Sequence, residues 1–268
     1  MSGFVSGLSL YLRSARAAMR AKMQYKGDFV AGLLLYAALS ATDFLMIAAI
    51  LTRFPRLGGW DVYEVGLLYG MASIAMGLYR TFGAELHEFE RYLVRGEFDV
   101  LLLRPWPTLL TLLGRNVEPE RLGNALQGAI ILSLCAKRLM DAGALDPLEV
   151  AYVAAASILG TLVPFSLALI TAAAGFWVVR IGELQTFVMY APVSASHYPL
   201  TIYPGWLRAL LTGVLPVGFM NFVPVQYLLG KGGGPWALWL SPLVIAAFSV
   251  LAYGCWRLGE RHYHSTGT

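Results

Sequence analysis

The residues best placed for intermolecular chemistry lie in a short charged run, Gly83 to Arg95. At helical spacing its side chains separate into two faces. The apolar face holds Leu86, Phe89, Tyr92 and Leu93, and the charged face holds Glu85, Glu88, Arg91 and Arg95. Gly96 then supplies a helix stop. The pattern predicts a short surface helix, either lying on lipid with solvated charges or docking a soluble partner.

The sequence predicts no catalytic residue. Gly230 and Lys231 are followed by further glycines, so the Ser or Thr that would hold magnesium in a phosphate-binding loop is missing. Any ATP would therefore be bound by another chain. His262 and His264 flank Tyr263 without a third ligand or helical spacing, and we predict no metal site there.

One acidic side chain, Asp43, lies well inside an apolar run. A charge at the centre of a membrane helix costs about 2.5 to 3.5 kcal/mol on insertion scales, so Asp43 should face a partner or water. Three interpretations are open: a structural contact with Ser73 or Tyr69, a cation-attracting position in a pathway, or a hydrated position near the outer interface.

Six apolar stretches must position these residues. Hydrophobic residues make up 57% of the 268 residues and charged residues only 13%, against roughly 25% in soluble domains. Each stretch is long enough to cross a bilayer, and none alternates with the period of a barrel strand. We therefore predict an all-α membrane protein with six transmembrane helices, because a spanning helix satisfies its own backbone groups.

The expected layout is one membrane domain over residues 1–268. It comprises an interfacial cationic helix at 1–27, two spans within 28–82, the charged loop at 83–105, two spans within 106–180, a fifth span and a re-entrant hairpin within 181–235, and a last span with a polar tail at 236–268. The fourth span is long and should tilt or bend at Pro164. Small residues Gly66, Gly70 and Gly77 suit close helix packing, either within one chain or between two.

The distribution of basic residues predicts the orientation. With both termini cytoplasmic, fourteen Lys and Arg residues lie inside and six outside, which agrees with the positive-inside rule. The net charge of +4 is then explained by anionic lipid at the inner leaflet, and no nucleic-acid partner is predicted.

Three stretches resemble permease subunits of ABC-2 type exporters, specifically the subfamily typified by viologen-exporter permeases. The first is Gly96 to Pro105, with Gly96, Asp99, Arg104 and Pro105 at the signature positions. The second is the proline-rich region that contains Tyr198, Pro199, Tyr203, Pro204, Pro216 and Pro224. The third is the tail from Trp256 to Gly267. The resemblance extends over nearly the whole chain, and the three stretches are specific when taken together.

The resemblance implies a cytoplasmic coupling helix at the charged run and an extracellular re-entrant hairpin before the last span. Glu85, Glu88, Arg91 and Arg95 would face a separate ATPase subunit, with Phe89 and Tyr92 as apolar contacts. ATP and magnesium would be bound by that subunit, and this chain would bind no cofactor. Two permeases, identical or paralogous, and two ATPases would form the working unit in the cell inner membrane.

The function expected from the resemblance is ATP-driven export of amphiphilic or hydrophobic compounds, such as drug-like cations, lipids or glycans. Substrate would pass between the two permeases, beside the first, second and fifth helices. The alternative is an ATP-independent secondary carrier or channel, although the sequence shows neither internal repeats nor a relay of ionisable residues at mid-membrane.

Overall fold

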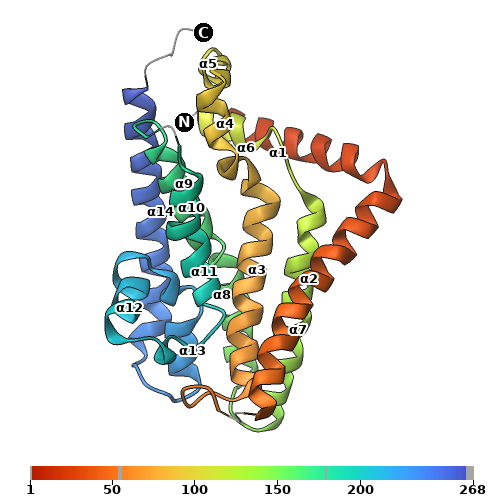
Figure 1. The fold of residues 1–268 in the computed structure, drawn as a ribbon, viewed down its shortest axis with the longest axis vertical. Coiled ribbons are helices and arrows are strands. Elements are labelled where there is room, and N and C mark those ends of the chain that lie inside the picture. Colours follow the sequence, from red (N-terminus) through yellow and green to blue (C-terminus); the bar gives the residue numbers. More distant parts are fainter. Residues whose placement is uncertain (1, 54–55, 179, 264–268) are drawn as a thin grey trace.

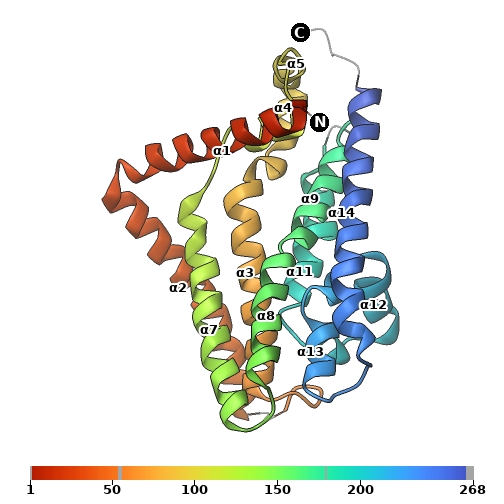
Figure 2. The same cartoon turned by 180° about the vertical axis from the view of Figure 1, so that it is seen from behind.

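The computed structural model describes residues 2–53, 56–178 and 180–263. Helix α1 (Ser2–Met23) lies across one end of a bundle of long helices, and α2 (Lys26–Arg53) runs from it toward the other end (Figures 1 and 2). The start of α1 and the end of the last described helix both lie at this end, which we call the α1 end. The interfacial helix predicted at 1–27 corresponds to α1, whose residues Arg13, Arg16 and Arg20 are exposed.

The centre of the bundle is a pair of closely packed helices, α3 (Val62–His87) and α7 (Leu122–Asp141). Asp61 caps α3, since its carboxylate accepts from the amides of Tyr63 at 2.8 Å and Glu64 at 2.9 Å. A Cβ atom on Gly70 would lie 2.8 Å from the carbonyl oxygen of Gly128 in α7.

Gly66 and Gly77, which with Gly70 form the predicted small-residue stripe, also face α7 closely. A Cβ atom on Gly66 would collide with Cys135, and one on Gly77 with Ala125, both of which belong to α7. Of the two predicted uses of this stripe, the structure therefore shows packing within one chain.

After α3 the chain forms three short helices at the α1 end: α4 (Phe89–Val94), α5 (Glu97–Leu102) and α6 (Thr108–Leu113). The prediction of one continuous helix from Gly83 to Arg95 was wrong in detail. Residues 83–87 extend α3, and the helix breaks at Glu88. Gly96 does stop α4, because it adopts a φ of 66°, which favours glycine.

The long fourth apolar stretch is divided into α8 (Pro147–Leu159) and α9 (Leu162–Ala174). The break at Gly160 and Thr161 lies just before Pro164. A proline ring clashes with the carbonyl four residues earlier, which is that of Gly160, so the bend falls slightly ahead of the predicted position.

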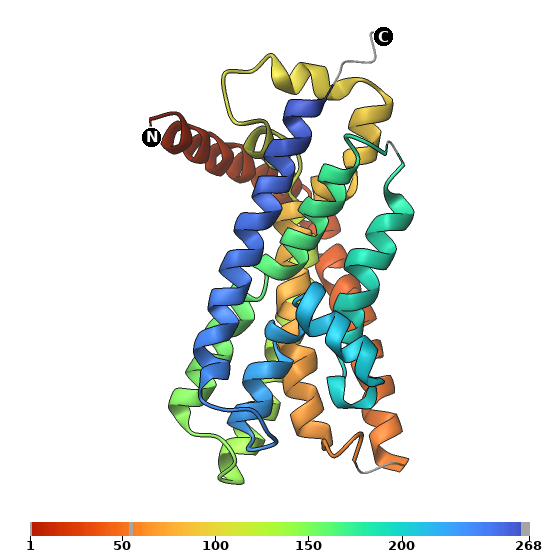
Figure 3. The ribbon, with the colours of Figure 1, turned by 90° about the vertical axis from the view of Figure 1, so that its left-hand side faces the viewer.

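The following segment consists of short pieces, many of which begin at a proline. A fifth helical segment contains α10 (Gly182–Gln185), a π-helical turn η2 (Thr186–Tyr190) and α11 (Ala191–Ala195). Then come η3 (Leu200–Ile202), α12 (Gly205–Ala209), η4 (Leu210–Val214), η5 (Val217–Phe219) and α13 (Phe222–Leu228). η5 and α13 pack against α14 (Trp236–His262), and Figure 3 shows the pieces after α11 in the half of the bundle away from the α1 end. The fifth helical segment instead begins at the α1 end, beside α4.

Within the described residues, four helical stretches are long and apolar enough to cross a membrane: Lys26–Leu51, Val62–Val94, Pro147–Ala174 and Trp236–His262. Helix α7 has 20 residues, enough for about 30 Å at 1.5 Å per residue, but it carries polar Asn124, Gln127 and Ser133. The fifth segment is interrupted by η2. Six spans therefore stay a prediction, while a multi-pass helical membrane protein is established.

Candidate functional site: the α4 face and the cavities beside α2

Helix α4 presents an exposed charged face at the α1 end. A surface groove of about 380 Å³ runs along it and is lined by His87, Glu88, Glu90, Arg91, Val94 and Arg95. Glu88 and Arg95 are exposed, and Val94 is 61% exposed despite its apolar side chain. This face is therefore polar and exposed, as the rim of a protein interface is.

Three residues predicted on this contact surface are instead buried within the chain. Glu85 is 3% exposed, Tyr92 1% and Phe89 0%. The Tyr92 hydroxyl donates a hydrogen bond to Glu85 Oε2, and Arg91 Nη2 lies 3.8 Å from the same oxygen. The helix breaks at Glu88 between these residues, and the hydrogen bond from Tyr92 holds the Glu85 carboxylate on the core side. The prediction that Glu85, Phe89 and Tyr92 contact a partner directly was therefore wrong. These side chains support α4 from the core side.

Beneath α4 and α5 five aromatic side chains form what we call the aromatic joint: Phe89, Phe98, Phe176, Trp256 and Tyr263. The ring centroids of Phe89 and Trp256 are 5.0 Å apart, and those of Phe98 and Tyr263 are 4.9 Å apart. Phe176, just after α9, contacts Trp256 at 5.3 Å. Edge-to-face contacts of this kind add about 0.5 to 1.5 kcal/mol each beyond area burial. The joint fastens α4 and α5 to the end of α14.

The joint also brings together the first and third signature stretches. Asp99 lies beside Tyr263, and burial together with this carboxylate raises the pKa of Tyr263 to about 12. Arg104 and Pro105 are exposed after α5, beyond the joint. Phe98 and Phe176, which connect the two stretches, were missed by sequence reasoning. Their only sequence signal was aromatic character near a span end.

Glu90 links α4 to the start of the fifth helical segment. Its Oε2 accepts hydrogen bonds from the backbone amides of Ile181 at 2.8 Å and Gly182 at 3.0 Å. A carboxylate at a helix N-terminus satisfies otherwise unpaired amides. Nearby, Gln185 Nε2 donates to the Leu86 carbonyl at 2.9 Å. Sequence reasoning did not select Glu90, because its partners lie about 90 positions away.

The residues of the predicted hairpin lie between α11 and α13. Pro199, Pro204 and Pro216 directly precede η3, α12 and η5, and Pro224 lies in the first turn of α13. Tyr203 donates to the Ala195 carbonyl at 3.2 Å, while Tyr198 packs against the core. Proline suits a first turn because no helical bond is lost there.

The hairpin region is anchored to the bundle by a buried amide. Asn221 is 0% exposed, and its Nδ2 donates to the carbonyls of Leu68 at 3.0 Å and Ser196 at 2.8 Å. His197 lies close by with its ring 4.8 Å from that of Tyr69, inside the bundle rather than at a surface turn.

Asp43 lines an inner cavity of about 300 Å³ between α2, α3, α7 and the fifth segment. Tyr69 and Ser73 line it too, but Tyr69 bonds to Ser40, with its hydroxyl 2.6 Å from the Ser40 carbonyl. Within the described residues Asp43 makes no hydrogen bond or ion pair, so the predicted contact with Ser73 or Tyr69 is not made. Asp43 is exposed toward the cavity mouth.

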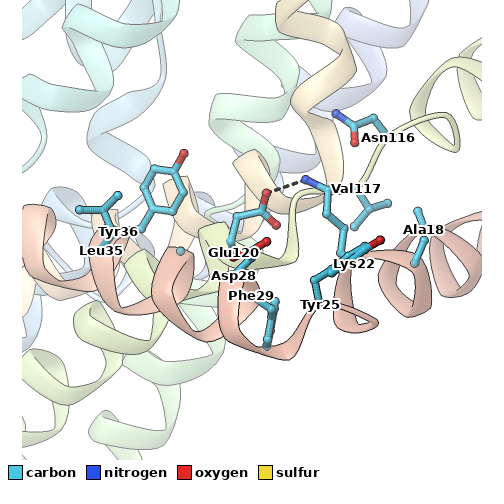
Figure 4. Close-up of a pocket in the computed structure, with 12 residues that line it drawn as sticks. Ala18, Lys22, Tyr25, Asp28, Phe29, Leu35, Tyr36, Asn116, Val117 and Glu120 are labelled. Atoms are coloured by element: carbon cyan, nitrogen blue, oxygen red, sulfur yellow. Dashed lines mark hydrogen bonds and ion pairs between the residues drawn. The ribbon is translucent and has the colours of Figure 1, made fainter.

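A second cavity, which we call the vestibule, lies between α1 and α2 and has a volume of about 610 Å³. Figure 4 shows Lys22 reaching from α1 to Glu120, with Nζ 2.7 Å from Oε1. Among the described residues no group of three or more His, Cys, Asp or Glu side chains is placed to hold a metal ion. His262 contacts the Leu258 carbonyl, and His264 lies outside the described residues.

The helical fold, the apolar spans and the charged α4 surface define a multi-pass membrane component. A family model described as ABC-2 family transporter protein matches residues 37–267, and the chain belongs to this family. It is therefore the membrane transport component of an ABC transporter. No curated protein and no solved structure matches the chain significantly.

Proposed function

We propose that this chain is the permease subunit of an ATP-driven exporter that moves amphiphilic or hydrophobic compounds out of the cytoplasm. Separate ATPase subunits, which bind ATP and magnesium, dock on the charged face of α4, and a second permease, identical or paralogous, completes the membrane unit. The subunit belongs to the viologen-exporter-like subfamily and spans the inner membrane six times with both termini cytoplasmic.

The observation that carries this proposal is the contrast between the two sides of α4. Its outer side exposes Glu88, Val94 and Arg95, whereas its inner side is packed through Phe89 into the aromatic joint. A surface segment that is rigidly attached to long helices can transmit a movement applied from outside, since packed elements have discrete arrangements. Glu90 extends the attachment to the fifth segment.

The inner cavity supports the transport part of the proposal. It is lined by α2, α3 and the fifth segment, and it combines polar groups such as Asp43 and Arg80 with apolar Leu39 and Met76. Such a lining suits a compound with a polar head and an apolar body. The proposed cycle is a shift between inward-open and outward-open packings that ATP binding drives and hydrolysis resets.

The test is co-expression with a candidate ATPase whose gene is adjacent. The Glu88→Ala, Arg95→Ala double variant removes exposed charges without touching the buried Glu85 and Tyr92. We expect it to lose co-purification of the ATPase or ATP hydrolysis stimulated by amphiphiles, while the wild type retains both.

The matched control is Lys137→Ala, Asp141→Ala, which removes one cation and one acid at the opposite end of the bundle. This control should behave as wild type. If no ATPase co-purifies with the wild type, or if both double variants behave alike, the docking assignment is wrong and an ATP-independent carrier becomes the better interpretation.

A further inference from the structure

The vestibule and the inner cavity share one wall residue, Tyr36 of α2. The two cavities are otherwise lined by different residues. Along α2 their lining positions follow at helical spacing: Asp28, Gly32, Leu35 and Tyr36 face the vestibule, and Tyr36, Leu39, Ser40 and Asp43 face the inner cavity. One continuous face of α2 therefore runs from the α1 end to the middle of the bundle.

Tyr36 separates the two cavities through a specific contact. The Arg121 guanidinium lies 4.2 Å from the centroid of the Tyr36 ring, and Arg121 Nε is held by Glu118 Oε2 at 2.8 Å. Figure 4 places Tyr36 and Lys22 on opposite sides of Glu120, so the tyrosine stands at the inner limit of the vestibule. A cation–π contact is worth about 0.5 to 2 kcal/mol, weak enough to open and close.

The charges along this face are of both signs and partly unpaired. In the vestibule Glu120 Oε1 pairs with Lys22, but its buried Oε2 has no hydrogen-bond partner within the described chain, and Asp28 makes no ion pair there. In the inner cavity Asp43 is unpaired among the described residues. Arg80 contacts only the Tyr190 side chain, with no carboxylate in ion-pairing range in the same part of the chain.

Three buried polar atoms in or next to the inner cavity add to this. Ser73 and His197 line the cavity, and Gln127 contacts it through Ser40, whose hydroxyl donates to Gln127 Oε1 at 2.9 Å. Ser73 Oγ, Gln127 Nε2 and His197 Nε2 have no hydrogen-bond partner in the described chain. Ser73 is 1% exposed and Gln127 6%. A buried polar atom without a partner costs about 1 to 3 kcal/mol, so a ligand that supplies donors and acceptors there gains that energy back.

We infer that this face of α2 is a lateral access route by which a membrane amphiphile with a zwitterionic head passes from the vestibule to the inner cavity, and that the Tyr36–Arg121 contact is its gate. The amine of the head meets Asp28 and Glu120 and then Asp43, while its anionic group meets Lys22 and then Arg80. The apolar chain stays in lipid beside α2, of which only 11% is buried. This inference rests on one part of the proposed function, namely that the transported compound is an amphiphile.

The test measures how fast a reagent reaches position 73, because Ser73 is the most deeply buried of the three groups without a hydrogen-bond partner in the described chain. A Ser73→Cys variant is made in the full chain with Cys135→Ala and Cys255→Ala, placed in lipid nanodiscs without any ATPase, and reacted with N-dodecylmaleimide. We expect Tyr36→Ala to raise the labelling rate about fivefold, the factor that corresponds to about 1 kcal/mol of lost cation–π contact. Tyr36→Phe, which keeps the ring, should restore the slow rate.

Two controls define the route. Leu34→Ala changes a residue that is 61% exposed elsewhere on α2 and should leave the labelling rate as it was. A water-soluble sulfonated maleimide should react more slowly than the dodecyl reagent. An unchanged rate in Tyr36→Ala, or faster reaction with the soluble reagent, would overturn the lateral route.

The head group is tested by protection of the same cysteine. Dodecylphosphocholine, dodecyltrimethylammonium and dodecyl phosphate share one chain, and the first should protect best, with its advantage over dodecyl phosphate lost in Asp43→Asn. Equal protection by the ammonium compound would overturn the zwitterionic assignment. Because no ATPase is present, a route found here stands even if docking on α4 fails, and the two proposals fail separately.

Discussion

At the scale of single residues, Glu90 has the clearest structural consequence. One carboxylate oxygen on α4 accepts from two consecutive amides, at Ile181 and Gly182, where the fifth segment begins. These amides would otherwise lack partners, because the first amides of a helix have none within it. Glu90 therefore holds α4 against the start of the fifth helical segment. Its removal should weaken the hydrogen bonding of that segment near Ile181 and Gly182.

We predict that Glu90→Ala increases hydrogen exchange of the amides from Ile181 to Gln185 by about tenfold to a hundredfold. That range corresponds to the 1.5 to 3 kcal/mol typical of hydrogen bonds to a charged group. Exchange is measured by mass spectrometry on the purified chain. Glu183→Ala, an exposed acid on α10, is the matched control. Equal exchange in the two variants would contradict the assigned role of Glu90.

The sequence predicted the burial or conformation of individual residues only where helical spacing within a short segment determines it. Leu86 and Leu93 are buried as the helical pattern required, and Gly96 has the left-handed conformation of a helix stop. Glu85 was assigned to the exposed face because its spacing matches that of Glu88. Its burial depends on the Tyr92 hydroxyl and the rest of the bundle, which no local pattern encodes.

At the scale of elements, the α3–α7 pair depends on close backbone approach. We predict that Gly70→Ala destabilises the protein by about 1 to 3 kcal/mol, as overpacking does, because its Cβ would lie 2.7 Å from the Leu132 Cβ. The measurement is thermal unfolding in detergent. Gly254→Ala, where a Cβ would meet nothing within 4 Å, should be neutral or slightly stabilising. A Gly70→Ala variant as stable as Gly254→Ala would show that the pair can move apart.

Element boundaries were predicted well where prolines and caps mark them. Pro119 begins the 3₁₀ turn η1 (Pro119–Arg121) just before α7, and the break in the fourth stretch falls beside Pro164. The fifth segment was harder. Its π-helical turn between Thr186 and Tyr190 packs against α9 and ends shortly before Pro192, whose ring clashes with the carbonyl of Val188, but a proline does not by itself specify a π turn. No local pattern marks the division between α3 and α4 at Glu88, after which Phe89 packs onto Trp256.

At the scale of the whole molecule, the two ends of the bundle differ in charge. The α1 end holds exposed Arg13, Arg16 and Arg20 together with α4, and the opposite end holds Lys137. We predict that the α1 end is cytoplasmic, following the positive-inside rule. In a chain lacking Cys135 and Cys255, the Arg95→Cys variant should react with an impermeant maleimide only in inside-out vesicles. The Lys137→Cys variant should react only in right-side-out vesicles, and the reverse pattern would invert the topology.

The overall architecture was largely predictable because lipid restricts a spanning chain to a small set of solutions. Helix α1, the charged α4 surface and the broken segment before α14 all lie in the expected residue ranges, while the interfacial position of α1 stays a prediction. The vestibule and the inner cavity were not predicted. They arise from the angle at which α2 leaves α1, and the turn between Met23 and Lys26 carries no distinctive signal for that angle.

The aromatic joint has a consequence for biosynthesis. Phe89 and Phe98 leave the ribosome early, but their partner Trp256 lies in α14 and their partner Tyr263 directly follows it, so both are translated much later. Until α14 has been inserted, α4 and α5 lack the support that orients their outer face. A chain that lacks α14 would thus offer a docking protein only an incomplete α4 surface. We expect the joint to act as a checkpoint that delays any docking on α4 until α14 has been inserted.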